Sequence, residues 1–221
     1  MDSFVTRLRT LDACAVSDAL DTLGLSGVAD GLAALSSSRR IAGRCVTVQL
    51  VADGTAQAPR HLCTAAVEYA DADSVIVIDH GGRTEVAGWG GILSLAASQR
   101  DVAGVVIDGA ARDIDESREL DLAIFGRAGT PRTARRRVIE KDWNIPVTIS
   151  GLSVSPGDYV VADASGVVFV PNDRIAEVLA AAEHIADRER RMAEDVRAGR
   201  PVSQVMGTNY ETMLDDRKGG A

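Results

Sequence analysis

Short apolar segments rich in β-branched residues recur along the chain, and segments with a helical spacing of apolar residues lie between several of them. Short runs of the first kind are typical of buried strands, and the second pattern is typical of helices that pack on a sheet. The predicted strands cover residues 45–52, 74–79, 102–108, 122–126, 146–149, 159–162 and 166–171. The predicted helices cover residues 14–24, 58–70, 92–100 and 172–198. Strands that alternate with helices in the first half of the chain indicate parallel βαβ units.

The second half of the chain has a different pattern. Residues 146–171 are β-rich and contain turn residues at 155–158 (Ser-Pro-Gly-Asp) and 163–166 (Asp-Ala-Ser-Gly), which favours a short antiparallel sheet. The chain has no internal repeat, and no linker rich in Pro, Gly or Ser separates the two halves. We therefore predict a single α/β domain over residues 1–221, with mixed sheets covered by helices.

The C-terminal helix, predicted over residues 172–200, changes character along its length. Its first half carries a face of Leu, Ile and Ala, whereas its second half is almost wholly charged. The charged half has little to bury against its own core. It is therefore either a solvated tail or an arm that packs on a neighbouring subunit.

Composition and charge argue against several classes of function. The formal net charge is −8 and aromatic residues make up 4% of the chain, whereas general nucleic-acid binding needs a positive field. The same charge disfavours anionic membrane surfaces, and no apolar run approaches the length of a membrane-spanning helix. Three widely spaced cysteines without a C-x-x-C pair indicate a reducing compartment. Because the N-terminus also lacks a signal-peptide pattern, we expect a cytoplasmic protein that binds neither nucleic acid nor membranes.

A glycine-rich segment, residues 79–93, joins a predicted strand to a predicted helix. A helix that starts at Gly90 or Gly91 presents the free backbone amides of Ile92 and Leu93 to an anion. No Walker lysine follows, and the glycine spacing is not that of a dinucleotide fingerprint. The segment is therefore either a site for a small anion, such as a carboxylate, or a flexible turn.

The segment DGAARDIDE, residues 108–116, follows the next predicted strand. Arg112 offers a planar fork for a carboxylate, and Asp113 offers a hard oxygen ligand for a hydrated divalent cation. The alternative is that Asp113 caps a helix over residues 113–120 while Arg112 and Glu116 form surface ion pairs. Because ligands of open α/β sheets bind beyond the carboxyl ends of strands, this segment and the glycine-rich one could meet over one pocket.

Two other features carry weaker signals. The basic run PRTARRR, residues 131–137, is more typical of a solvated loop or a subunit contact than of a nucleic-acid site. The three histidines are too scattered for a ligand set, and only His80, beside the glycine-rich segment, is a candidate. No G-x-S-x-G motif occurs, which argues against a serine hydrolase.

Four stretches together resemble the RraA-like family: WGGIL, VAGVVIDGAARDIDE, LDLAIFGRAGTPR and VSPGDYVVADASGVVFVP. That family includes 4-hydroxy-4-methyl-2-oxoglutarate (4-carboxy-4-hydroxy-2-oxoadipate) aldolases, relatives described as oxaloacetate decarboxylases, and regulators of ribonuclease E. The resemblance covers most of the chain. It implies a β/β/α arrangement similar to swivelling domains, assembled as homotrimers or homohexamers with sites between subunits.

The resemblance also implies roles for particular residues. Arg112 would bind the carboxylate of the pyruvyl part of the substrate, together with the backbone at Ile92 and Leu93, which follows Gly90 and Gly91. Asp113 would hold a hydrated Mg²⁺ or Mn²⁺ ion. In the aldolases an acidic residue stands at the position of Gly91, so this chain lacks one expected carboxylate. An acid from a neighbouring subunit's last helix would also contribute to the metal site, and Glu189 or Glu194 could match it. Glu116 has no role in the resemblance, but it is a candidate supporting group or ligand at the metal site.

Such a site suits a divalent-metal-dependent lyase that cleaves a C–C bond of a small 2-oxo acid. Retro-aldol cleavage and oxaloacetate decarboxylation share a pyruvate enolate, and the loss of the acid at position 91 favours the decarboxylation. The only lysines, Lys141 and Lys218, lie outside the motifs, which argues against a Schiff-base aldolase. The alternatives are a different metal-assisted reaction on a related acid and a non-catalytic regulator that binds a ribonuclease or another protein. Asp113 counts against the regulator, because the regulators of this family lack an aspartate after the arginine.

Overall fold

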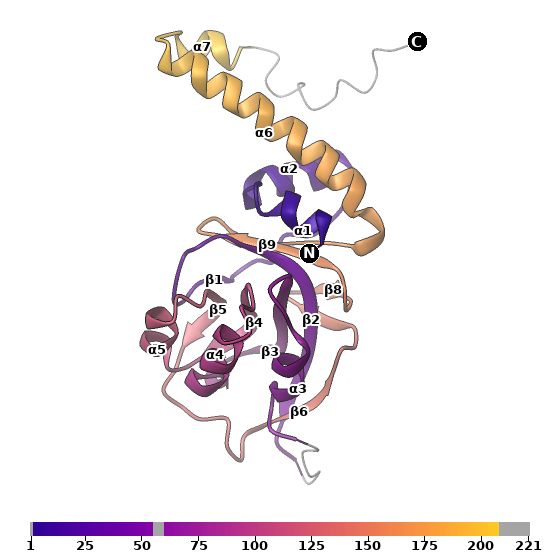
Figure 1. Ribbon diagram of the computed structural model, residues 1–221, viewed down its shortest axis with the longest axis vertical. Coiled ribbons are helices and arrows are strands. Elements are labelled where there is room, and N and C mark those ends of the chain that lie inside the picture. Colours follow the sequence, from indigo (N-terminus) through magenta and orange to yellow (C-terminus); the bar gives the residue numbers. More distant parts are fainter. Residues whose placement is uncertain (1, 55–59, 208–221) are drawn as a thin grey trace.

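Parallel strands form the centre of the molecule (Figure 1). The computed structural model describes residues 2–54 and 60–207. Strands β2, β3, β4 and β5 lie side by side in that order, and each pairs in parallel with the next. They cover Ile41–Ala52, Ser74–Trp89, Gly104–Ala111 and Ile124–Gly129. The parallel arrangement predicted for the first half of the chain is confirmed.

Antiparallel strands extend this sheet on both sides. Strand β1 pairs with β5, while β6 and β9 both pair with the long strand β2, and β10 pairs with β9. Strands β7 and β8 form a separate hairpin. The bounds are Ala33–Ala34 (β1), Val138–Trp143 (β6), Val147–Ile149 (β7), Leu152–Val154 (β8), Tyr159–Asp163 (β9) and Gly166–Val170 (β10). The β-rich second half is therefore antiparallel, as predicted, but only the turn at 163–166 joins paired strands (β9 and β10), whereas residues 155–158 connect β8 to β9, which lie in different sheets.

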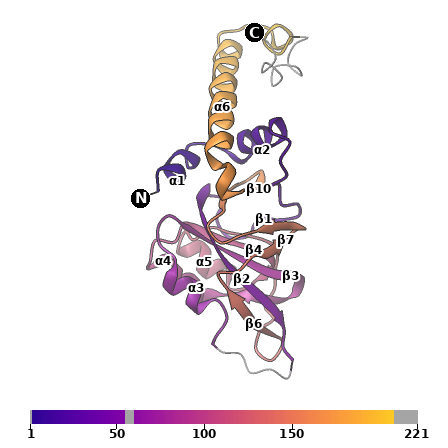
Figure 2. The same cartoon turned by 90° about the vertical axis from the view of Figure 1, so that its right-hand side faces the viewer.

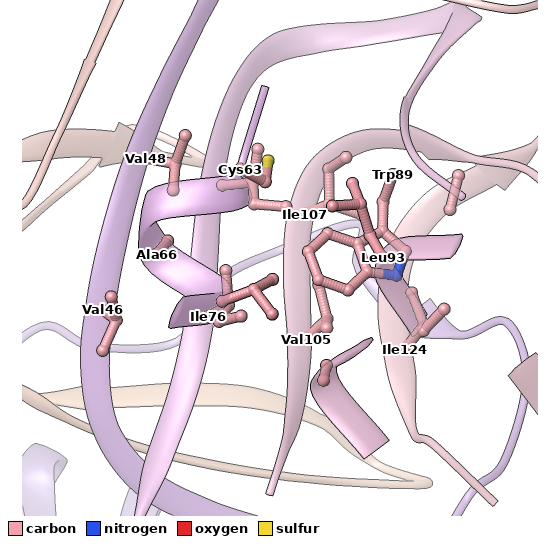
Figure 3. Packing of buried hydrophobic residues seen from close by; sticks show 14 of the residues in the cluster. Val46, Val48, Cys63, Ala66, Ile76, Trp89, Leu93, Val105, Ile107 and Ile124 are labelled. Carbon is pink, nitrogen blue, oxygen red and sulfur yellow. The ribbon is translucent and has the colours of Figure 1, made fainter. Parts of the chain in front are cut away.

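Three short helices cover one face of the parallel strands. They are α3 (Thr64–Tyr69), α4 (Gly91–Ser98) and α5 (Ile114–Glu119), which follow β2, β3 and β4 in the chain. Figure 3 shows Trp89 and Leu93 packed beside Val105, Ile107 and Ile124 in the core beneath them. Trp89 is 1% exposed. Burial of such large apolar side chains fixes the junction between β3 and α4 at this place on the sheet.

A second group of helices packs on the β9–β10 hairpin. It consists of α1 (Ser3–Leu8), α2 (Ala13–Thr22) and the first part of α6 (Ile175–Arg197), which follows the 3-10 turn η1 (Asn172–Arg174). The last buried residue of α6 is Ile185, and the rest of the helix projects away from the sheet toward α7 (Val202–Val205) (Figures 1 and 2). The mixed α/β fold with a long C-terminal helix is confirmed. Every helix within the described residues falls short of the length and apolarity that a membrane crossing requires.

The structure moves the ends of β3, β4 and β5 beyond the predicted residues, and the changes in β3 and β4 involve the motif segments. β3 continues through the glycine-rich segment to Trp89, with three irregular steps in its pairing with β4. Gly81 and Gly82 allow these irregularities, because their φ angles of 63° and 71° are unfavourable for other residues. β4 continues past Asp108 to Ala111, so that Asp108 is a buried residue inside the strand rather than its last residue. Pairing between β3 and β4, which helix α4 separates in the chain, extends both strands beyond their predicted apolar segments.

Helix positions also differ from the prediction in places. α3 begins at Thr64, six residues later than predicted, and residues 58 and 59 lie outside the described part of the chain. Cys63, directly before it, has a φ of 64°, a left-handed conformation that interrupts a helix. The sequence pattern also missed α1 and strand β6, in which three consecutive charged residues follow only two apolar ones.

Candidate active site

An open cavity of about 480 Å³ lies where β3 and β4 end and α4 begins, a volume suited to a small-molecule ligand. The carboxyl ends of two neighbouring parallel strands therefore contribute to one site, as the sequence predicts. The lining residues include Gly90, Gly91, Ile92, Leu93, Arg112 and Asp113 from this edge of the sheet, and Arg60, Arg135 and Glu140 from elsewhere. The two motif segments do meet over one pocket.

Arg112 and Asp113 interact directly in the cavity wall. Asp113 Oδ2 accepts hydrogen bonds from the Arg112 Nε (3.0 Å) and from the Gly91 backbone amide (2.9 Å). Asp113 occupies the N-cap position of α5, but its side chain makes no capping hydrogen bond, and its φ is 56°. The alternative in which the Asp113 side chain caps α5 is therefore wrong, because the carboxylate faces α4 instead of its own helix; Arg112 does form an ion pair, and its partner is Asp113. Asp113 Oδ1 has no hydrogen-bond partner among the described residues and is available to a ligand.

Gly91 lies against the carboxylate of Glu116. A Cβ atom at position 91 would stand 1.9 Å from Glu116 Oε2 and 3.2 Å from the Asp113 Cβ. Any side chain at position 91 would therefore displace Glu116, which reaches this point from α5. The side chain of Glu116 occupies the space that an acidic residue at position 91 would need.

The first turn of α4 faces the same cavity. Gly90 is the N-cap, and the first intrahelical bond runs from the Ser94 amide to the Gly90 carbonyl (3.0 Å). The amides of Ile92 and Leu93 therefore have no partner inside the helix, while the Gly91 amide is taken by Asp113. Two free amides and a helix N-terminus favour an anion at this place.

A buried chain of hydroxyl groups fixes these parts relative to one another. Trp89 Nε1 donates to Ser94 Oγ (2.8 Å), which shares a hydrogen bond with Ser117 Oγ (2.8 Å). The Ser117 hydroxyl group donates a hydrogen bond to the Asp113 carbonyl oxygen (3.1 Å). The end of β3, helix α4 and helix α5 are thus joined under the site, so that the site residues are held in place before a ligand arrives.

Sequence reasoning missed the other end of the cavity. Glu140, on β6, is 1% exposed, and its Oε2 accepts a hydrogen bond from the Cys63 amide (2.6 Å). Its Oε1 lies 3.4 Å from the Arg60 Nε, without hydrogen-bond geometry. Burial raises the pKa of Glu140, against the smaller lowering effects of the Cys63 amide and Arg60. No local pattern marks this carboxylate, because its partners are nearly eighty residues away in sequence.

The weaker candidates have clear places in the structure. His80 is fully buried, its Nε2 lies 2.8 Å from the Val86 carbonyl, and burial lowers its pKa, so that it is a core residue outside the cavity. The basic run is a loop, and its Arg135 lines the cavity. Asp108 is held by Arg127 and by the Ser150 amide. The buried Asp108 therefore has a structural role.

The described residues contain no group of three or more His, Cys, Asp and Glu side chains that could hold a metal ion. Asp113 and Glu116 are the two carboxylates that meet at Gly91. Two carboxylates suit a cation that keeps most of its waters, as Mg²⁺ does, rather than a complete protein cage. Glu189, on the projecting part of α6, lies away from this cavity in its own chain. Burial and, to a smaller extent, the nearby carboxylates of Asp12 and Asp18 raise the pKa of Glu189.

Residues 13–169 match the RraA-like family (Aldolase/RraA), and the chain belongs to that family. It is 35% identical over 207 residues to a protein of Halalkalibacterium halodurans named "Putative 4-hydroxy-4-methyl-2-oxoglutarate aldolase", with 92% of this chain and 95% of that protein covered. It is 28% identical over 204 residues to protein DlpA of Legionella pneumophila. That match covers 92% of this chain but only 33% of DlpA, so the chain spans about a third of the longer protein.

Solved structures agree with this assignment. An uncharacterized protein from Pseudomonas syringae pv. tomato has a TM-score of 0.83 and 33% sequence identity, with 93% of this chain and 97% of that one covered. RraAS2 of Streptomyces coelicolor, described as an unusual member of the RNase ES inhibitor RraA protein family, has a TM-score of 0.75 and 26% identity, with 86% and 96% covered. The resemblance read from the motifs is confirmed at the level of family and fold.

Proposed function

We propose that the protein is a divalent-metal-dependent lyase that cleaves a C–C bond of a small 2-oxo acid and releases pyruvate. The observation that supports this proposal most strongly is the arrangement at one edge of the cavity. There Arg112, the free α4 amides and a carboxylate oxygen of Asp113 converge. This combination offers positive groups for a carboxylate beside a negative group for a cation.

The roles follow from the chemistry of each group. Arg112 binds the carboxylate of the 2-oxo acid, and the amides of Ile92 and Leu93 bind the same end of the substrate. Asp113 is oriented by two hydrogen bonds on Oδ2, which leaves Oδ1 for the cation. Glu116 supplies a second carboxylate over Gly91. We therefore assign the cation, Mg²⁺ or Mn²⁺, to the space beside Asp113 and Glu116.

A divalent cation held by Asp113 and Glu116 would supply Lewis acidity, which favours the negative charge that a 2-oxo acid develops on its keto oxygen when the C3–C4 bond breaks. Arg112 and the α4 amides hold the substrate in register through its carboxylate. The underlying hydroxyl chain keeps α4 and α5 from separating as charge develops. Decarboxylation of oxaloacetate requires only the cation, Arg112 and the α4 amides. Retro-aldol cleavage also requires a base that removes the C4 hydroxyl proton, a role that falls to a group other than the two carboxylates assigned to the cation.

We also propose assembly into homotrimers or homohexamers in which α6 of a neighbouring subunit reaches the site. The outer part of α6 has no core of its own to cover, and its Glu189 or Glu194 would add a carboxylate. Beside the cavity, Ile92 is 81% exposed and Leu95 is 46% exposed, which leaves an apolar surface on α4 that a subunit could cover.

Release of pyruvate, coupled to lactate dehydrogenase, tests the proposed function. We expect turnover of oxaloacetate or of 4-hydroxy-4-methyl-2-oxoglutarate that stops with EDTA and returns with Mg²⁺ or Mn²⁺. Oxaloacetate also decarboxylates with free metal ions, so the rate without enzyme is the required control. Absence of metal-dependent turnover of both acids would contradict the proposal and favour the non-catalytic regulator.

A further inference from the structure

Asp113 adopts a backbone conformation that turns its side chain away from the helix it begins. Its φ of 56° and ψ of 42° lie in the left-handed region, which is unfavourable for residues other than glycine. An aspartate at an N-cap usually has an extended backbone, and its carboxylate then accepts a hydrogen bond from an amide of the first helical turn. Asp113 makes no such bond. Two arrangements therefore compete for this carboxylate: one caps α5, and the other, which the structure adopts, faces α4.

The residues before α4 leave room for the second arrangement. A Cβ atom at Gly90 would stand 3.0 Å from Asp113 Oδ2, and one at Gly91 would stand 3.2 Å from the Asp113 Cβ. The Gly91 amide and the Arg112 Nε bind the carboxylate in this place. Both groups act on the end of the side chain. The left-handed backbone of Asp113 needs a stabilising contact of its own.

Ser117 makes that contact. Its hydroxyl group and its amide both donate to the Asp113 carbonyl oxygen, each at 3.1 Å. The amide bond is the ordinary first bond of the helix, whereas the hydroxyl bond is additional. Ser117 is fully buried and is not among the residues that line the cavity. It can therefore act on a ligand only through Asp113.

The buried chain of hydroxyl groups runs in one direction, toward Asp113. Trp89 Nε1 can only donate, and the Asp113 carbonyl oxygen can only accept. Ser94 Oγ therefore accepts from Trp89 and donates to Ser117 Oγ, which leaves the Ser117 proton for the carbonyl. Ser94 and Ser117 are both 0% exposed, so that water does not compete for these bonds. Successive donors in a buried chain strengthen one another.

We propose that Ser117 is a positioning residue for Asp113: its hydroxyl group stabilises the left-handed backbone and so keeps the carboxylate in the cavity instead of on the first turn of α5. The inference rests on the proposed function, in which this carboxylate binds the cation. Without the hydroxyl group, Asp113 relaxes toward the extended, capping conformation in a fraction of the molecules. The apparent affinity for the cation falls with the fraction that stays competent to bind.

Binding of Mn²⁺, measured by electron paramagnetic resonance, tests this role without reference to turnover. We expect Ser117→Ala to bind Mn²⁺ about fivefold more weakly than the wild type, the scale of one neutral hydrogen bond. Ser94→Ala leaves the bond between Ser117 and Asp113 in place, so its effect should be smaller.

Thr47→Val is the matched control. It also removes a fully buried hydroxyl group that donates to a backbone carbonyl, that of Ile145 (2.6 Å), but at a place outside the cavity lining. We expect it to leave the Mn²⁺ affinity unchanged even where it lowers the stability of the fold. Equal losses of affinity in Thr47→Val and Ser117→Ala would assign the effect to general destabilisation and overturn the inference.

The backbone carbon-13 chemical shifts of Asp113 in the metal-free protein report its conformation directly. We expect values typical of the left-handed region in the wild type and a change toward extended values in Ser117→Ala. Unaltered shifts, or an Mn²⁺ affinity equal to that of the wild type, would overturn the inference. A wild type that binds no Mn²⁺ would contradict the proposed function, and the shifts alone would then decide the role of Ser117.

Discussion

The two ends of the cavity are built in different ways. The Arg112 end is made of residues that follow strands β3 and β4 directly in the chain. Hydrogen bonds between the end of β3, α4 and α5 hold these residues together. The Arg60 end depends on a buried carboxylate, Glu140, brought from β6 to the start of α3. One end is therefore a local feature of the βαβ unit, whereas the other is a product of tertiary pairing. We expect the chemistry to depend on the first end, whereas the second end depends on the packing that buries Glu140.

The largest effect is expected at the Arg112 end, from Asp113→Asn. The substitution preserves the shape of the side chain but removes the charge that we assign to the cation. We expect kcat/KM for pyruvate release to fall by about a hundredfold or more, the usual scale for loss of one electrostatic group at a reacting centre. Asp115→Asn is the matched control, because Asp115 is on the same helix, is 91% exposed and pairs with Arg118. A similar rate for wild type and Asp113→Asn would exclude the assigned role.

A smaller effect, on metal affinity, is expected at Gly91. Gly91→Ala introduces a Cβ that displaces Glu116, and we expect Mn²⁺ to bind about tenfold more weakly, as is typical when a supporting group at a metal site is lost. Gly129→Ala is the control, because a Cβ there meets only Ile114 at an ordinary distance of 3.6 Å. Electron paramagnetic resonance of Mn²⁺ gives the affinity without reference to turnover.

The same position allows a sharper experiment on the missing acid. Gly91→Asp alone should weaken Mn²⁺ binding, because its side chain and Glu116 compete for one space. Combined with Glu116→Ala, it moves the carboxylate from α5 to α4, and affinity should return to within about threefold of the wild type. If Gly91→Asp by itself strengthens binding, Glu116 does not hold the place of that acid.

The difference between the two ends also explains what could be predicted from the sequence. Arg112, Asp113 and the α4 amides follow apolar runs directly, so strand periodicity and the rule for strand ends locate them. Glu140 lies in the segment Val138–Trp143, where the strand has no apolar run and forms only because β2 offers an antiparallel partner. The position of Glu116 over Gly91 could not be predicted from the sequence either, because it depends on how α5 packs against α4. Contacts between segments distant in sequence decide these cases, and no local pattern encodes them.

The smallest expected effect concerns stability at the Arg60 end. Burial raises the pKa of Glu140 in the folded protein above its value in the unfolded chain. Between these two pKa values the folded state binds more protons than the unfolded state, so the free energy of unfolding falls as pH rises through that window. This contribution is fully present below the unfolded pKa and is lost above the folded one. Glu140→Gln has no carboxyl group to titrate, and it should remove this part of the pH dependence.

Urea unfolding of wild type and Glu140→Gln at a series of pH values above about 4.3, the ordinary pKa of glutamate, measures the effect. The free energy of the wild type relative to the variant should decline as pH rises and then level off. A constant offset between the two proteins would mean that Glu140 titrates alike in both states. In that case the role of Glu140 is restricted to the hydrogen bond with the Cys63 amide. Burial of a charged carboxylate, at a cost in free energy, would then not explain the position of Arg60.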